Sequence, residues 1–121
     1  MIRLATLQVL ITSILLSNNN HPIILVHGFL GWGKEEVGDK NYWGGENDIE
    51  KYLNDRGYQV YSVSLGPVSS TYDCAIETFY QIKGGQVDYG QEHSEKYKII
   101  RKPEGKVYKG FYPEWNEENP V

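Results

Sequence analysis

The chain has 121 residues, with 12 Lys and Arg against 16 Asp and Glu, and so a formal net charge of −4. From this length alone we expect one domain rather than a large multidomain enzyme, and the mild acidity argues against a general nucleic-acid binder, which is usually strongly basic. Because Cys74 is the single cysteine, a secreted scaffold built on intrachain disulfides is also excluded.

Residues 1–20 differ from the rest of the chain. A basic residue, Arg3, precedes a mostly apolar run at 4–16, and polar residues follow at 17–20. The run is too short and too polar to span a bilayer of roughly 30 Å as a helix. Its order predicts a signal peptide and hence secretion, although the usual small-x-small cleavage site is missing. The alternative is an amphipathic or buried N-terminal helix; in both cases the globular part is expected to begin near His21.

A short apolar run and a long loop open the globular part. Residues 22–26, Pro-Ile-Ile-Leu-Val, show no polar alternation, which is typical of a strand buried on both faces of a parallel sheet. His27 and Gly28 end this strand. The following stretch, as far as Gly45, is rich in glycine, Trp and Tyr, and predicts a long loop held by aromatic side chains.

A helix is predicted next, capped by Asn47 or Asp48 and ended by Gly57. Its apolar face has the spacing i, i+3, i+4 and i+7 and consists of Ile49, Tyr52, Leu53 and the stem of Arg56. Residues 58–65 then alternate in part and predict a second strand. Strand, helix and strand in this order indicate a right-handed crossover and a parallel or mixed sheet.

A second helix is predicted after the Gly-Pro break at 66–67. Ser69 or Ser70 can cap it, and the Gly-Gly pair at 84–85 can end it. Its predicted apolar face consists of Tyr72, Ala75 or Ile76, Phe79 and Ile82. We expect this face to be the buried one.

The periodicity fades from Gln86 onward, which predicts irregular structure with an aromatic loop at 110–115. Residues 96–109 hold six of the twelve basic residues and only one acid. Such a cluster could contact phosphates or an anionic surface. A solvated loop is the preferred interpretation, because Pro103 and Gly105 break any helical stripe.

The most informative local pattern is the apolar strand that ends in His27-Gly28-Phe29. In α/β-hydrolases a backbone N–H just after an early strand supplies half of the oxyanion hole, and a glycine there allows close backbone approach. The alternative is a simple junction between a strand and a turn. None of the seven serines lies in G-x-S-x-G, and Cys74 lies in a predicted helix, where a packing role is favoured over a reactive thiol. A complete acyl-transfer site therefore cannot be assembled from these residues.

Only four residues cluster as candidate metal ligands, namely Asp73, Asp88, Glu92 and His93. A zinc site needs three or four well-placed ligands, and the sequence contains no close His-His or Cys-Cys pair. A phosphate-binding glycine loop is also missing from the sequence. The residues by themselves thus give poor support for a metal or nucleotide site.

Several motifs, taken in series, resemble one protein family. They are Ile24-Leu-Val-His-Gly-Phe-Leu-Gly-Trp-Gly33, Tyr42-Trp-Gly-Gly45, Asp48-Ile-Glu50, Leu53-Asn-Asp-Arg-Gly-Tyr58, Gly66-Pro-Val-Ser-Ser70, Tyr72-Asp73, Lys83-Gly-Gly-Gln-Val-Asp-Tyr-Gly90 and His93. From about Pro22 to Trp115 the chain is similar to the N-terminal part of the staphylococcal and bacillary triacylglycerol lipases, the large-lid, zinc-containing α/β-hydrolases. The resemblance implies an α/β fold that is the incomplete N-terminal part of an α/β-hydrolase sheet, with strand, loop, helix, strand, helix and an irregular aromatic C-terminal segment.

The resemblance also implies a division of the active site. It assigns the backbone N–H of Phe29 to the oxyanion hole and places the catalytic Ser, acid and His beyond Val121. Residues 21–121 are then expected to be a partial lipase domain that ends before the nucleophile elbow, a fragment of a secreted carboxylic ester hydrolase that is inactive alone. A lipid or ester substrate is expected for the full-length form only. The alternative is a non-enzymatic module that binds a lipid surface or a partner.

A zinc site of two Asp and two His is a further feature of the family that the chain resembles. Asp73 matches one Asp and His93 matches one His. The second His is expected six residues after His93, where this chain has Ile99, and the fourth ligand would lie beyond Val121. Two ligands do not close a zinc site, so zinc is expected only in a complete homologue.

Overall fold

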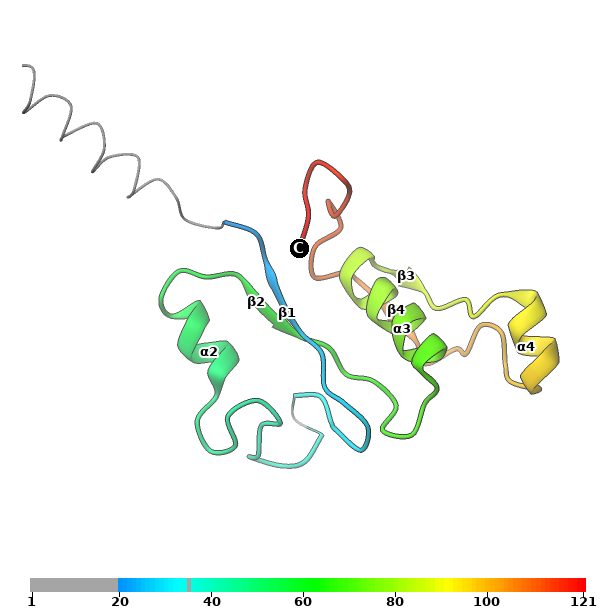
Figure 1. The fold of residues 1–121 in the computed structure, drawn as a ribbon, viewed down its shortest axis with the longest axis horizontal. Coiled ribbons are helices and arrows are strands. Elements are labelled where there is room, and N and C mark those ends of the chain that lie inside the picture. The colour runs from blue at the N-terminus through cyan, green and yellow to red at the C-terminus, as the bar shows by residue number, and fades with distance from the viewer. Residues whose placement is uncertain (1–19, 35) are drawn as a thin grey trace, which may run out of the picture.

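The computed structural model describes residues 20–34 and 36–121, and Figure 1 shows their arrangement. The predicted signal segment at 1–17 lies outside these residues. Strands β1 (Ile23–Leu25) and β2 (Val60–Ser62) form a two-stranded parallel sheet, and helix α2 (Ile49–Asn54) lies in the connection between them. The predicted order of strand, long loop, helix and parallel strand is confirmed, but both strands are shorter than the runs that predict them. The expectation that β1 is buried on both faces was wrong, because Ile23 is exposed and Ile24 and Leu25 are only half-buried.

Helix α2 begins as predicted and ends early. Asp48 is its N-cap, with a side chain that accepts a 2.8 Å hydrogen bond from the backbone N–H of Lys51. The helix stops at Asn54 rather than near Gly57. The Asn54 side chain pairs with the backbone of Val60 instead, donating to its carbonyl at 3.0 Å and accepting from its N–H at 3.1 Å. This amide therefore fastens the helix end to the start of β2.

Helix α3 (Thr71–Lys83) has the predicted ends, with Ser70 as N-cap and Gly84 as C-cap. The prediction of its buried face was only partly right, because Ile82 alone of the predicted residues is buried. Tyr72 and Phe79 are exposed, whereas the buried residues of the helix are Glu77, Gln81 and Ile82. Hydrophobicity misassigned the face because Glu77 and Gln81 have hydrogen-bond partners inside the protein, which removes most of the cost of burying them.

The prediction of irregular structure after Gln86 was partly wrong. Helix α4 (Gln91–Tyr97) and an antiparallel pair of two-residue strands, β3 (Gly85–Gln86) and β4 (Val107–Tyr108), lie in this segment. Only Ser94 is buried in α4, so the sequence of this helix lacks the apolar periodicity from which a helix is predicted. Strands of two residues are too short to show alternation.

The core is formed by β2 and the segment that follows it, by α3, and by the segment that follows β3. Its buried apolar residues are Val60, Val63, Leu65, Ile82, Val87 and Tyr89. Among the described residues, 20–34 and 36–121, no helix is both long enough and apolar enough to cross a membrane.

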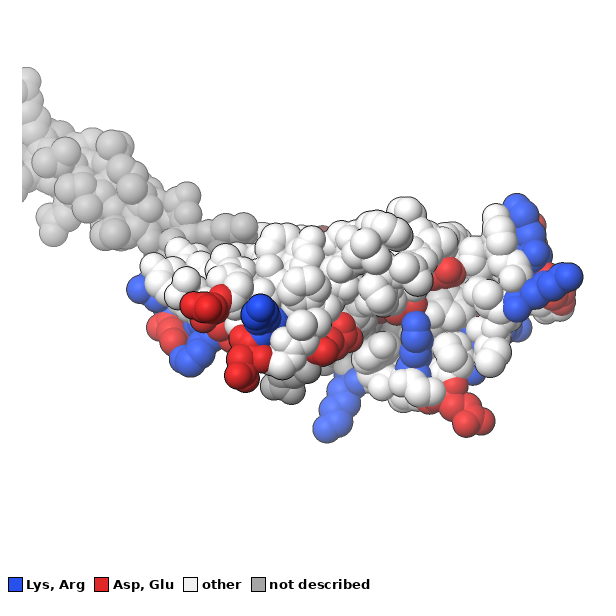
Figure 2. Space-filling model, turned by 90° about the horizontal axis from the view of Figure 1, so that it is seen from below, with Lys and Arg blue, Asp and Glu red and all other residues white. Residues whose placement is uncertain are grey.

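The basic cluster at 96–109 is only partly a solvated loop. Arg101 and Lys102 form ion pairs with Asp88, and Lys106 forms one with Glu77, so half of the six cations have internal acidic partners. Figure 2 shows positive and negative side chains interspersed on one face rather than gathered into a single basic patch.

Candidate functional site

His27 fixes the start of the loop that follows β1. The ring is 6% exposed, and its Nε2 accepts a 3.0 Å hydrogen bond from the backbone N–H of Leu65. Its Nδ1 lies 3.1 Å from the carbonyl oxygen of Gly28. Because a neutral imidazole donates through one nitrogen and accepts through the other, this geometry corresponds to the tautomer with the proton on Nδ1. The side chain thus joins the end of β1 to the segment that leaves β2.

Phe29 follows in a tight turn. The N–H of Leu30 donates to the carbonyl of Pro67 at 2.8 Å, and the N–H of Gly31 donates to the carbonyl of Gly28 at 2.9 Å. A Cβ at position 31 would lie 2.6 Å from His27 Nδ1, so the turn requires glycine there. The Phe29 side chain is 77% exposed, and its backbone N–H donates to no group within the described part of the chain.

A cleft of about 340 Å³ lies beside this turn. It is lined by residues 26–29 on one side and by residues 65–67, with Ser69, Thr71 and Cys74, on the other. The half-buried thiol of Cys74 has a pKa raised by burial and by the nearby carboxylates of Glu77 and Asp73. A raised pKa leaves less thiolate, which agrees with a packing role for Cys74 rather than a nucleophilic one.

The histidines near the cleft and on α4 have partners other than serine. Nε2 of His27 is occupied by the N–H of Leu65, and Nε2 of His93 lies 2.8 Å from Oδ1 of Asp73. Ser64 Oγ donates to the carboxylate of Glu36, which is the main cause of the lowered pKa of that carboxyl group. None of these contacts pairs a serine with a histidine; the one serine among them, Ser64, is hydrogen-bonded to a carboxylate.

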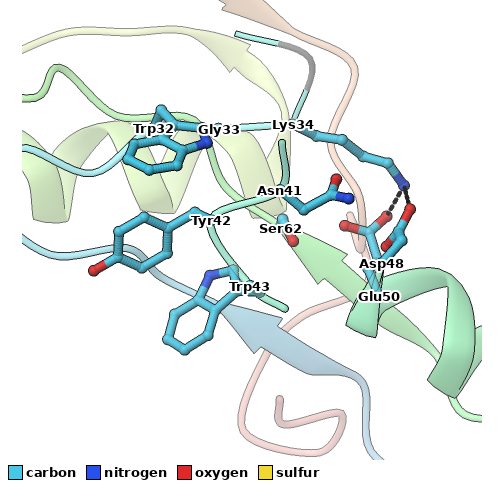
Figure 3. A pocket seen from close by; sticks show the side chains of 9 residues that line it. All are labelled: Trp32, Gly33, Lys34, Asn41, Tyr42, Trp43, Asp48, Glu50 and Ser62. Atoms are coloured by element: carbon cyan, nitrogen blue, oxygen red, sulfur yellow. Dashed lines mark hydrogen bonds and ion pairs between the residues drawn. The ribbon is translucent and has the colours of Figure 1, made fainter. Parts of the chain in front are cut away.

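The loop between β1 and α2 is held by aromatic side chains, as predicted (Figure 3). The ring of Tyr42 meets Trp32 edge-on at 5.3 Å and Trp43 at 5.2 Å between centroids. These are the edge-to-face arrangements that the charge distribution of aromatic rings favours. The loop that connects β1 to α2 therefore has a fixed aromatic centre.

Two polar contacts complete this loop. Lys34 Nζ lies 3.3 Å from carboxylate oxygens of both Asp48 and Glu50 at the start of α2, as drawn in Figure 3. On the other side, the backbone N–H of Gly28 donates to the hydroxyl of Tyr42 at 3.4 Å. Tyr42 therefore supports the turn that carries Phe29, a role that its sequence position did not reveal.

The predicted metal ligands are only partly brought together. Asp73 and His93 are in direct contact, but Asp88 is bonded to Arg101 and Glu92 is exposed. Position 99 presents an exposed Ile side chain. Over residues 20–34 and 36–121, no group of three or more His, Cys, Asp or Glu side chains could hold a metal ion.

Comparison with known proteins identifies the family of the chain. A family model described as "Lipase-like, C-terminal domain" matches residues 19–121. The chain belongs to this lipase-like family. The resemblance to the staphylococcal lipases that the sequence motifs indicate is therefore confirmed.

Curated relatives of this lipase-like chain include a lipase of Staphylococcus epidermidis, 45% identical over 101 residues, and Lipase 2 of Staphylococcus aureus, 44% identical over 110 residues. The matched regions cover 80% and 85% of this chain but only 14% and 15% of those proteins. The chain thus spans about one seventh of the length of the curated relatives it matches.

Solved lipase structures share the fold of this segment. Lipase 1 from Pelosinus fermentans is 47% identical with a TM-score of 0.77, and Staphylococcus hyicus lipase is 39% identical with a TM-score of 0.79. Each match covers 86% of this chain and 27% of the other. These two structural neighbours are lipases, which agrees with the predicted α/β-hydrolase class.

Proposed function

We propose that this lipase-like chain supplies one oxyanion-hole donor, the backbone N–H of Phe29, and part of the acyl-binding cleft of a carboxylic ester hydrolase. The observation that carries the proposal is the position of this N–H. It follows an early strand, has no hydrogen-bond acceptor among the described residues, and belongs to a residue that lines the 340 Å³ cleft. The relatives are named lipases, which supports a lipid or ester as substrate.

Such a donor acts on the tetrahedral intermediate of acyl transfer. Attack on an ester carbonyl places negative charge on its oxygen, and an N–H already aimed at that point stabilises the charge without reorganisation. The second donor in an α/β-hydrolase is the N–H of the residue after the nucleophile. Because no serine of the 121 residues lies in G-x-S-x-G, we expect these residues alone to turn over no ester.

A chimera tests the role of Phe29 in the presence of a nucleophile. Residues 20–121 replace the matched segment of Pelosinus fermentans lipase 1, which is 47% identical, and kcat is measured on p-nitrophenyl butyrate. Phe29→Pro removes the N–H and should lower kcat about 10²–10³-fold. Phe29→Leu keeps the N–H and is the matched control, with kcat expected to change by no more than about tenfold. Equal losses in the two variants would contradict a backbone role.

The 121-residue chain alone is assayed on the same ester. Its rate should equal that of the Phe29→Pro variant and of a heat-treated sample. Turnover by the intact chain that Phe29→Pro abolishes would show that the chain has its own nucleophile, and the proposal that it is inactive alone would be abandoned.

Binding to a lipid surface is a second candidate function. Phe29, Leu30 and Val68 are all exposed, and their two loops are joined by the Leu30–Pro67 hydrogen bond. Adjacent exposed apolar side chains of this kind often mark interaction sites. Co-sedimentation with phosphatidylcholine vesicles should detect the chain in the pellet, and Leu30→Ser with Val68→Ser should reduce it. No binding by the intact chain would remove this candidate.

Secretion belongs to the same proposal. It rests on the sequence of residues 1–17, whose structure is not described. N-terminal sequencing of the protein recovered from the culture medium would test it, since an intact Met1 on the recovered protein would contradict cleavage of a signal peptide.

A further inference from the structure

Asp73 on α3 and His93 on α4 form a direct side-chain contact between the two helices. Nε2 of His93 lies 2.8 Å from Oδ1 of Asp73, and the two side chains are 15% and 19% exposed. The other carboxylate oxygen, Oδ2, accepts a 2.8 Å hydrogen bond from the hydroxyl of Ser70. Both oxygens of Asp73 and Nε2 of His93 therefore already have partners within the protein.

Two tyrosines enclose the imidazole ring of His93. Tyr72, from α3, stacks on it with the ring centroids 4.0 Å apart and the planes at 27°. Tyr97, from α4 itself, lies 4.7 Å away at 50°. The Tyr72 hydroxyl donates to the carbonyl of Tyr89 at 3.3 Å, which ties this aromatic group to the chain that leads into α4. The hydrogen bond between His93 and Asp73 is thus largely shielded from water, and this strengthens it.

The position of α4 makes this contact important. In Figure 1, α4 lies at the edge of the molecule, beyond the end of α3 and at the tip of two connections. Its own sequence buries only Ser94, so apolar packing contributes little to holding it. Side-chain contacts such as those of His93 must supply much of what keeps α4 in place.

The donor set does not fit the zinc site that the family resemblance implies. A structural zinc site is closed by four ligands. Asp73 and His93 supply two, and the position of the second His is Ile99, which has no donor atom in its side chain. Asp88 is held in two hydrogen bonds by Arg101, and neither Asp88 nor Glu92 joins Asp73 and His93 in a group of three ligands within the described residues.

We propose that Asp73, His93, Tyr72 and Tyr97 form a metal-independent clamp that holds α4 on α3, in place of a zinc site. The hydrogen bond between Asp73 and His93 fixes the orientation of α4 relative to α3, and the two tyrosine rings pack against the imidazole and exclude water. Holding α4 by this clamp needs no metal ion.

Zinc binding and local stability are measured on the full chain. Titration of ZnCl₂ into the EDTA-treated protein should show no saturable binding with a Kd below about 1 μM, the range typical of structural zinc. Hydrogen exchange of the α4 amides should be the same in EDTA and in ZnCl₂. One-to-one binding below that Kd, lost in His93→Gln, would overturn the proposal.

Variants test the clamp directly, with all measurements in EDTA. His93→Ala should speed exchange of the α4 amides by roughly fivefold or more, while the amides in the C-terminal half of α3 keep their protection. Glu92→Ala, a neighbouring exposed acid on the same helix, is the matched control and should leave α4 unchanged. If His93→Ala unfolds the whole chain, the same exchange measurement is made on Tyr97→Leu, which removes only one enclosing ring and should also speed exchange of the α4 amides. Unchanged α4 exchange in Tyr97→Leu and in any folded His93→Ala protein would overturn the clamp.

Discussion

The backbone N–H of Leu65 donates a 3.0 Å hydrogen bond to Nε2 of His27, across 38 positions of the sequence. One step earlier along the same ladder, the N–H of Val63 donates to the carbonyl of Leu25 at 3.0 Å. In a regular parallel ladder the N–H of Leu65 would reach the carbonyl of residue 27. The imidazole takes the place of that carbonyl, so β1 can end and turn toward Phe29 without leaving a buried N–H unpaired.

Removing this acceptor should destabilise the fold. His27→Ala leaves the buried N–H of Leu65 unsatisfied, at a cost of about 1–3 kcal/mol, before any loss of packing is counted. His27→Gln offers an amide oxygen at a similar reach and should recover part of the loss. Urea unfolding measures both. Stability of His27→Ala equal to that of the unmodified chain would show that the bond is absent in solution.

A second buried side chain, that of Gln81, pairs with the backbone of the segment after β2. The buried amide of Gln81 accepts from the N–H of Ser64 at 2.9 Å and donates to its carbonyl at 2.7 Å. Gln81→Met keeps the length of the side chain but leaves both backbone groups unpaired, so it should cost about 2–4 kcal/mol in urea unfolding. Gln91→Met makes the same change on the exposed face of α4 and should shift stability by no more than about 0.5 kcal/mol. Similar effects at the two positions would contradict this role for Gln81.

The buried carboxylate of Glu77 depends on one cation. Glu77 is 1% exposed and accepts from Lys106 Nζ at 2.6 Å and from the Tyr89 hydroxyl at 2.7 Å. Desolvation lowers the pKa of Lys106, but the hydrogen bonds to Glu77 and Tyr89 outweigh it and leave the pKa raised, so Lys106 stays charged.

Lys106→Met should therefore leave an unpaired buried charge and destabilise the chain by about 3–5 kcal/mol in thermal or urea unfolding. The double variant Glu77→Gln with Lys106→Met removes the charge as well and should be more stable than Lys106→Met alone. If Glu77→Gln adds a further loss instead, the cost of Lys106→Met does not come from an uncompensated carboxylate.

The sequence predicted what local patterns encode. The strand at the apolar run of β1, the caps Asp48 and Ser70, and the glycine that ends α3 each follow from a few neighbouring residues and are confirmed, although β1 is not buried on both faces. The two polar residues on the buried face of α3 could not be predicted in this way. Glu77 and Gln81 are buried only because Lys106 and Ser64, which lie far away in sequence, satisfy them.

In the candidate site, too, the sequence predicted the features set by neighbouring residues and missed those set by distant ones. The strand ending in His27-Gly28-Phe29 pointed to the turn, because glycine at a strand end is a local signal. The support from Tyr42 and Leu65 depends on contacts between distant segments, which no spacing rule contains. Asp73 and His93 belong to the four clustered candidate metal ligands, and the family resemblance singles out these two, but their direct hydrogen bond is a finding of the structure.

The ion pair of Asp88 with Arg101 joins the residues before and after α4, and it should make the stability of the chain depend on pH. Arg101 donates to both carboxylate oxygens of Asp88, at 2.7 and 2.8 Å, and the N–H of Gly90 adds a bond at 2.9 Å. The side-chain bonds from Arg101, followed by that from Gly90, hold the pKa of Asp88 well below its ordinary value. A lowered pKa in the folded state means that the unfolded chain binds the proton more readily, so acid favours unfolding.

The contribution of Asp88 should therefore be complete above about pH 4, the ordinary pKa of an aspartate, and should be lost as the pH falls through the lower folded-state pKa. Asp88→Asn should lower Tm at neutral pH, and its difference from the unmodified chain should narrow steadily below about pH 4. Thermal unfolding followed by circular dichroism measures both curves. Asp55→Asn, which removes an exposed pair with Lys51 on α2, is the control and should show a small difference throughout. A difference for Asp88→Asn that stays constant into acid would mean that the geometry of its hydrogen bonds, and not its charge, stabilises the segment.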